Sequence, residues 1–403
     1  MRSPILQLLP ILVALLACHA PARAELNWNV GFREGGGGFF LSSPDHRFTL
    51  SLLGYGQFRG HIISSDYGTG GRADQPLGFL VRRTRFTAHA SLYEDIELST
   101  ELGTPNIRAI TAPAAAAVAV PTTFTYPTSD FGVVEARATA RLSDDVLQLR
   151  VGKFTGPFSS ENVRPTHRLD TAERSTAINS LMTFPALDPQ VGAMLFGRFQ
   201  DDGFHYFLGV FNGNGHSLGT DPDDNGDKEI QAKIVFRAHP RILLGVGYDF
   251  AKMPTRLAAL VDHLFVPVIT GGVTGTRHGF TADIDLTWDK FSWRAEIIYF
   301  TFPDSKAAGF MSYLLGVSTT FGLLVSGDAN KGTQLIARYD FGGVKVGTDY
   351  ALHSGILGVN VAFNPAVRYQ ANFVMELPTV AGTGAYAAKR VLYALVNEVQ
   401  VRF

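Results

Sequence analysis

The sequence has 403 residues, of which 46% are hydrophobic and 18% are charged, and its formal net charge is −1. A charge so close to zero gives no reason to expect nucleic acid or another highly charged partner. The single cysteine is Cys18, near the start of the chain. We therefore expect no disulfide in the folded part. We also predict no cofactor.

The first residues have the pattern of a secretory signal. Arg2 precedes an apolar stretch at 5–17, and Ala22-Arg23-Ala24 supplies a cleavage motif. We therefore expect residues 1–24 to be removed on export. An alternative stays open, because the residues before Cys18 resemble a lipoprotein processing site, which would leave a lipidated Cys18.

No segment after the signal is a candidate transmembrane helix. The uncharged stretch at 109–129 comes closest, but Pro113, Pro121 and Pro127 interrupt it. Its apolar part also falls short of the roughly 20 residues that a helical span requires. We expect this stretch to form a long loop.

From residue 47 onward the chain alternates between apolar and polar residues, in about 16 segments of roughly 10 residues. In the first of them, Leu50 and Leu52 alternate with Thr49 and Ser51. Short connections alternate with longer ones, and we place the short ones on the periplasmic side. The short turns are 143–145, 201–203, 239–241, 289–290 and 364–366. The pattern predicts an all-β fold, a transmembrane antiparallel β-barrel at 47–403, preceded by a short N-terminal segment at 25–46.

The final segment, 390–403, has two chemically distinct faces. Val399, Val401 and Phe403 lie on one face, while Glu398 and Gln400 lie on the other. A terminal strand of this kind is typical of bacterial outer-membrane barrels. Alternation alone does not distinguish a lipid-facing side from the core of a soluble sheet, so a soluble β-protein remains an alternative.

Short segments spread over most of the chain carry a family resemblance. They are 38–45, 81–86, 150–154, 157–161, 172–175, 209–213, 357–360 and 364–368. In their order and spacing they resemble the phosphate-selective porin O and P family of outer-membrane channels. The resemblance implies a 16-stranded barrel, a homotrimer, and a third external loop folded into the pore, here residues 156–189.

Loop 156–189 also departs from the family pattern. The tight phosphate channels of this family resemble one another in having lysines at the constriction, and this loop has none. Its candidate constriction residues are Glu161, Arg164, His167, Arg168 and Arg174. With its other acids the loop is close to charge balance, which argues against strong phosphate specificity.

The polar face of the strands is expected to line the pore. The candidate basic residues are Arg59, Arg83, Arg85, Arg137, Arg141, Arg150, Lys233, Arg237, Arg294, Arg338 and Arg368, and the acidic ones are Asp283, Asp285 and Glu296. Guanidinium groups stay charged and present a planar fork to an anion. Basic residues gather on the first five strands and the acids on the tenth and eleventh, which predicts a transverse field. Alternatively, these arginines pair with lumen glutamates and stiffen the wall.

Together these features predict an outer-membrane porin for passive diffusion of small hydrophilic solutes, with a mild anion preference and membrane lipid around it. A receptor or adhesin and a barrel enzyme are the alternatives. We assign no catalytic residue, because Gly-x-Ser-x-Gly and His-Glu-x-x-His motifs are absent. Residues 221–226 match the first half of a calcium loop, but Ala232 stands where the bidentate glutamate belongs, so we predict no metal.

Overall fold

The computed structural model describes residues 28–33, 37–64, 77–104, 131–183, 187–199, 202–213, 226–265, 267–380 and 391–403. The predicted signal with Cys18, the loop at 109–129 and residues 221–225 of the calcium-like segment lie outside these ranges. Within the described ranges, no helix is long and apolar enough to cross a membrane.

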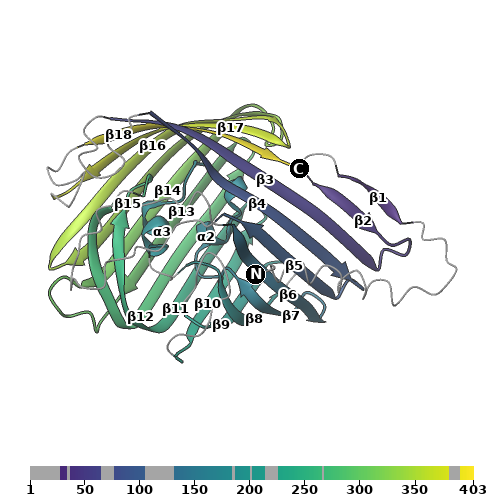
Figure 1. The fold of residues 1–403 in the computed structure, drawn as a ribbon, viewed down its shortest axis with the longest axis horizontal. Helices are drawn as coiled ribbons and strands as arrows, with labels where there is room; N and C mark the ends of the chain where they lie inside the picture. The colour runs from purple at the N-terminus through teal and green to yellow at the C-terminus, as the bar shows by residue number, and fades with distance from the viewer. Residues whose placement is uncertain are drawn as a thin grey trace, which may run out of the picture.

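Sixteen antiparallel strands, β3 to β18, form one closed barrel (Figure 1). Their bounds are β3 Phe48–Ile63, β4 Leu77–Leu92, β5 Ile96–Gly103, β6 Gly132–Ser143, β7 Leu147–Phe154, β8 Gln190–Phe199, β9 Phe204–Phe211, β10 Glu229–His239, β11 Ile242–Val261, β12 Pro267–Trp288, β13 Phe291–Thr301, β14 Met311–Gly327, β15 Gly332–Val346, β16 Thr348–Asn364, β17 Val367–Pro378 and β18 Leu392–Arg402. Each strand pairs with the next, and β18 pairs with β3 to close the ring. The predicted all-β barrel is therefore confirmed.

The segment before the barrel contains two short strands that the sequence pattern did not predict. β1 (Asn29–Phe32) and β2 (Phe39–Ser42) pair as a hairpin, and β2 continues onto Thr49–Leu52 of β3. β18 pairs with the later part of the same edge, Tyr55–Ile63. The hairpin thus extends the wall beyond the end of β18, as Figure 1 shows.

The barrel wall has an apolar outer face and a largely polar inner face. On β3, Phe58 is 51% exposed, whereas its neighbours Gln57 and Arg59 are buried inside. On β18, Val399 is exposed and Gln400 is buried. In water such an outer face would be unfavourable, but it suits contact with lipid acyl chains.

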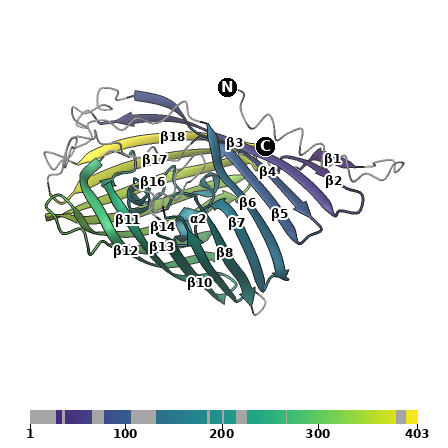
Figure 2. The same ribbon diagram turned by 60° about the horizontal axis from the view of Figure 1, so that its bottom comes forward.

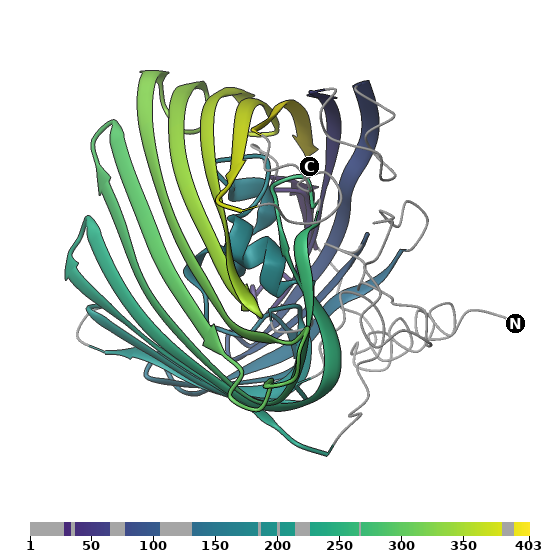
Figure 3. The same ribbon diagram turned by 90° about the vertical axis from the view of Figure 1, so that its left-hand side faces the viewer.

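The third long connection, between β7 and β8, folds inside the barrel, as predicted. It carries α2 (Ser160–Val163), the 3-10 helix η1 (Thr166–Arg168) and α3 (Thr176–Leu181). Ser159 and Ser175 cap α2 and α3, because their side chains accept hydrogen bonds from the first-turn N–H groups. Figures 2 and 3 show these helices surrounded by strands. We call residues 155–183 and 187–189 the inserted segment.

The inserted segment rests on an apolar core inside the barrel. Ile178 and Leu181 of α3 are fully buried against Leu260 of β11 and Leu314 of β14, in a cluster that includes Phe300. Because these inner positions are apolar, they fill the part of the barrel interior around α3. The larger open space lies on the other side of the inserted segment.

Candidate functional site

A cavity of about 850 Å³ lies inside the barrel beside the inserted segment. One side is formed by inward side chains of strands β3 to β12, and the other by residues 157–174 of the inserted segment. A second cavity, of about 440 Å³, lies toward the short turns and shares His167, Arg168 and Arg402 with the first. The two cavities form a candidate path for a solute.

Glu173 fastens the inserted segment to the first two barrel strands. Its carboxylate lies 2.5 Å from Arg59 and from Arg82, and 2.6 Å from Arg83. Burial would raise the pKa of Glu173, but the three guanidinium charges hold it well below its usual range. A carboxylate held by three cations stays ionised and locks the segment to the wall.

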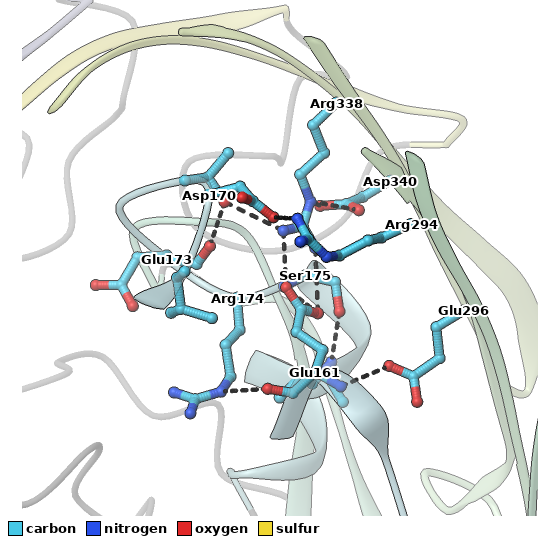
Figure 4. A network of polar contacts seen from close by, with 12 residues as sticks. Glu161, Asp170, Glu173, Arg174, Ser175, Arg294, Glu296, Arg338 and Asp340 are labelled. Atoms are coloured by element: carbon cyan, nitrogen blue, oxygen red, sulfur yellow. Dashed lines mark hydrogen bonds and ion pairs between the residues drawn. The ribbon is translucent and has the colours of Figure 1, made fainter. Parts of the chain in front are cut away.

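A second attachment joins Glu161 of α2 to Arg338 of β15 (Figure 4). The two Nη groups of Arg338 donate to the two Glu161 oxygens, at 2.7 and 3.2 Å, and Arg338 also pairs with Asp340 at 2.9 Å. Burial opposes ionisation of Glu161, but the charge and hydrogen bonds of Arg338 lower its pKa to about 2. The Ser175 N–H adds a third bond to this carboxylate, so Glu161 links two turns of the segment.

Glu296 of β13 holds the start of α2. It accepts hydrogen bonds from the Ser159 hydroxyl at 3.1 Å and from the N–H groups of Ser160 and Glu161, at 3.0 and 3.2 Å. These are N–H groups that a helix start leaves without an intrahelical partner. An acid expected to face the pore thus serves to bind the segment.

Asp170 forms the third ionic attachment. It lies 2.6 Å from Arg294 of β13 and 3.2 Å from Arg164 of the same segment. Asp285 of β12 completes the cluster, because it pairs with both arginines, at 2.9 and 3.3 Å. Arg164 and Arg294 are therefore neutralised where they face the cavities.

The tip of the β11–β12 hairpin also reaches into the barrel. His263 is 2% exposed, and its two ring nitrogens lie 2.7 Å from Asp340 of β15 and from Glu376 of β17. Burial would lower the pKa of His263, but these carboxylates raise it to about 10. The ring is therefore protonated at neutral pH and ties the hairpin to β15 and β17.

The predicted pore residues divide into groups according to their surroundings. Arg59, Arg83, Arg338, Glu296 and Glu161 are inward but lie under or within the inserted segment and hold it. Arg85, Arg137, Arg150, Arg164, His167, Arg168, Arg174, Lys233, Asp283 and Asp285 line the larger cavity. Arg294 and Arg368 line the second cavity. Arg141 pairs with Glu97, and Arg237 with Asp202, near the short-turn end of the barrel.

The charges that line the larger cavity do not cancel. Four cations have a carboxylate partner in the lining: Arg85 with Glu101 at 2.9 Å, Arg137 with Glu135 at 2.5 Å, Lys233 with Asp283 at 2.5 Å, and Arg164 with Asp285 at 3.3 Å. Arg150, Arg168, Arg174 and Arg402 also line it, and none forms an ion pair with a described residue. Among the described residues, the side chains of this lining therefore carry four more positive than negative charges. The transverse field between basic and acidic walls stays a prediction.

Several of the important residues could not be assigned from the alternation. Arg82 is the extra residue of a β-bulge at Gln57/Phe58, and its side chain reaches Glu173. His263 follows Leu257–Val261, which is apolar at both alternating positions. Such a run indicates a strand that is buried on both faces. It is the sequence feature that could have revealed that the tip of the β11–β12 hairpin enters the barrel.

Comparison with solved structures shows the same fold. The anion-selective porin from Comamonas acidovorans has 13% identity and a TM-score of 0.58, over 88% of this chain and 100% of its own. OprB of Pseudomonas putida has 11% identity and a TM-score of 0.58, over 89% and 95%. The trimer form of OmpT from Vibrio cholerae has 11% identity and a TM-score of 0.56, over 88% and 99%.

These likenesses confirm the barrel architecture of bacterial outer-membrane proteins and porins. No protein-family model and no curated protein matches the sequence.

Proposed function

We propose that this protein is an outer-membrane porin that lets small hydrophilic solutes and ions diffuse passively, with a mild preference for anions. The observation that carries the proposal is the excess of arginine in the larger cavity. Arg150, Arg168, Arg174 and Arg402 face that cavity without a carboxylate partner among the described residues. A solute crossing the barrel therefore meets unbalanced positive charge.

The physical effect of that excess follows from the surroundings of the cavity. Charges in a narrow space with low-dielectric walls act strongly on an ion within a Debye length, roughly 8 Å at physiological salt. Anions are enriched there and cations are depleted. The preference stays mild because the other charged side chains of the lining are paired. The net charge of the lining is therefore small compared with the number of its charged side chains.

The structural neighbours support the broad part of this proposal. They include an anion-selective porin and an outer-membrane protein in its trimer form. By analogy, we propose a homotrimer in the bacterial outer membrane, formed after removal of residues 1–24. Membrane lipid and small anions are then its partners.

A phosphate-selective channel is the narrower form of the hypothesis and ranks below a general porin. The inserted segment has no lysine in the sequence. Several of the inward arginines, such as Arg59, Arg83 and Arg338, already form ion pairs with carboxylates. They are therefore not free to bind a passing phosphate.

The proposal is tested by the zero-current potential of the purified barrel in a planar bilayer with a chloride gradient. We expect an anion-directed potential that falls clearly in the double variant Arg168→Gln/Arg402→Gln. The matched control is Arg33→Gln/Arg47→Gln, which removes two exposed arginines before the barrel and keeps the potential. A barrel that refolds but does not conduct, or that prefers cations, would contradict the proposal.

A further inference from the structure

One part of the cavity wall is apolar, although it faces the open space. Met194 of β8, Phe207 of β9, Val235 of β10 and Leu243 of β11 all line the larger cavity. Phe196 lies beside them, with its ring stacked on Phe207 at 6.1 Å and an angle of 5°. We call these five residues the apolar patch.

Arg150 borders the apolar patch. It lies opposite Met194 in the β7–β8 register, and its guanidinium carbon is 4.8 Å from the centre of the Phe196 ring. Its Nε donates to the Thr139 hydroxyl at 3.2 Å, and no described carboxylate pairs with it. An unneutralised cation therefore stands beside aromatic and aliphatic surface within one cavity.

We propose that Arg150 and the apolar patch form a binding site for organic monocarboxylates with an apolar body, such as aromatic carboxylates. The carboxylate binds Arg150, and the ring lies against Phe207 and Val235, which are only partly buried and line the same cavity. This inference rests on the proposed porin function and names the class of solute that the same cavity favours.

The combination distinguishes this solute class from inorganic anions. Phosphate and chloride gain from the arginine charge but gain nothing from apolar surface, and they remain strongly hydrated. An aromatic carboxylate has the same charge on one end, and its ring removes apolar wall area from water. Two effects, the attraction to the arginine charge and the burial of apolar surface, therefore contribute to its binding free energy. Only the first contributes to the binding of a small inorganic anion.

Benzoate is the probe, acetate is the matched small carboxylate, and inorganic phosphate is the inorganic control. We would measure how each reduces chloride conductance through the purified barrel in a planar bilayer. Benzoate is expected to reduce it at about tenfold lower concentration than acetate, as partial burial of a ring implies. Phe207→Ser should remove this difference between benzoate and acetate, and Arg150→Gln should weaken both.

Arg168→Gln separates this site from the general charge of the cavity. It should weaken benzoate and acetate in proportion and leave their ratio unchanged, because Arg168 is not part of the apolar patch. If Phe207→Ser does not refold, Val235→Ser removes another member of the patch and should reduce the ratio.

Equal potency of benzoate and acetate in an anion-preferring barrel would overturn this inference and leave the porin proposal standing. Stronger reduction by phosphate than by benzoate would overturn it too. Loss of all anion preference would instead overturn the proposed function.

Discussion

Arg338 donates two hydrogen bonds to Glu161 across 177 residues of sequence, and it does so inside the barrel. Arg338→Gln would leave Glu161 buried without its main counter-charge, which typically costs about 3–5 kcal/mol. We therefore expect the inserted segment to detach locally. Single-channel recording should show a larger and noisier conductance than in the parent protein, while an unchanged conductance would argue that this pair does not hold the segment.

Glu173 forms ion pairs with three arginines at once, and Glu398 also pairs with one of them, Arg59. Removing the charge of Glu173 should therefore have a larger effect on stability. In Glu173→Gln, Arg59, Arg82 and Arg83 remain close together with too little negative charge. We expect a loss of several kcal/mol in the free energy of unfolding, measured by urea titration in detergent or lipid. Glu94→Gln, in an exposed short turn, is the control and should change it by less than about 0.5 kcal/mol.

Gly316 provides the room in which α3 packs against β14. A Cβ placed at Gly316 would overlap Ala177, and the backbone of Gly316 needs no positive φ. Gly316→Leu should therefore displace α3 and cost about 1–3 kcal/mol. Because α3 would then move away from the wall and toward the larger cavity, open-channel conductance should fall. Gly355→Leu, at a roomier position of β16, is the matched control and should leave conductance as it was.

His167 should make anion preference depend on pH. Burial, together with the positive charges of Arg402, Arg168 and Arg368, lowers its pKa to about 4. The ring is thus neutral at pH 7 and gains a proton as pH falls through about 4, which adds positive charge to both cavities. The zero-current potential should become more anion-directed between pH 6 and pH 3.5.

His167→Gln isolates that contribution. The variant keeps all carboxylates that titrate in this pH range. The difference in zero-current potential between parent and variant therefore reports His167 alone. If both proteins change by the same amount over this pH range, His167 does not titrate in the pore.

The outer and inner faces of the strands could be predicted because period-two alternation is a local property. Phe58 and Arg59 illustrate it, since neighbouring residues of a strand must point to opposite sides of the wall. The length of the connection after β7 also marked the inserted segment. Both features can be recognised without knowing which residues far apart in the sequence contact each other.

Which inward side chains are covered by the inserted segment could not be predicted in the same way. Alternation places Arg59 inward, but only the path of the inserted segment decides that Glu173 covers it. Likewise, Val374 and Val396 occupy inner positions of β17 and β18 yet are apolar and buried. They belong to one apolar cluster with Ala172 and Ile178 of the inserted segment, so their burial depends on residues far apart in sequence.

The seam between β3 and β18 has a consequence for the kinetics of folding. Gln57 and Gln400 meet there although 343 residues separate them, and Gly54 exchanges backbone hydrogen bonds with Phe403. Contacts of such high contact order form slowly, because the ends of a very long stretch of chain must come together. Until they do, both strands carry unpaired edges that can bind other chains. Ring closure is therefore the step at which aggregation competes most directly with assembly.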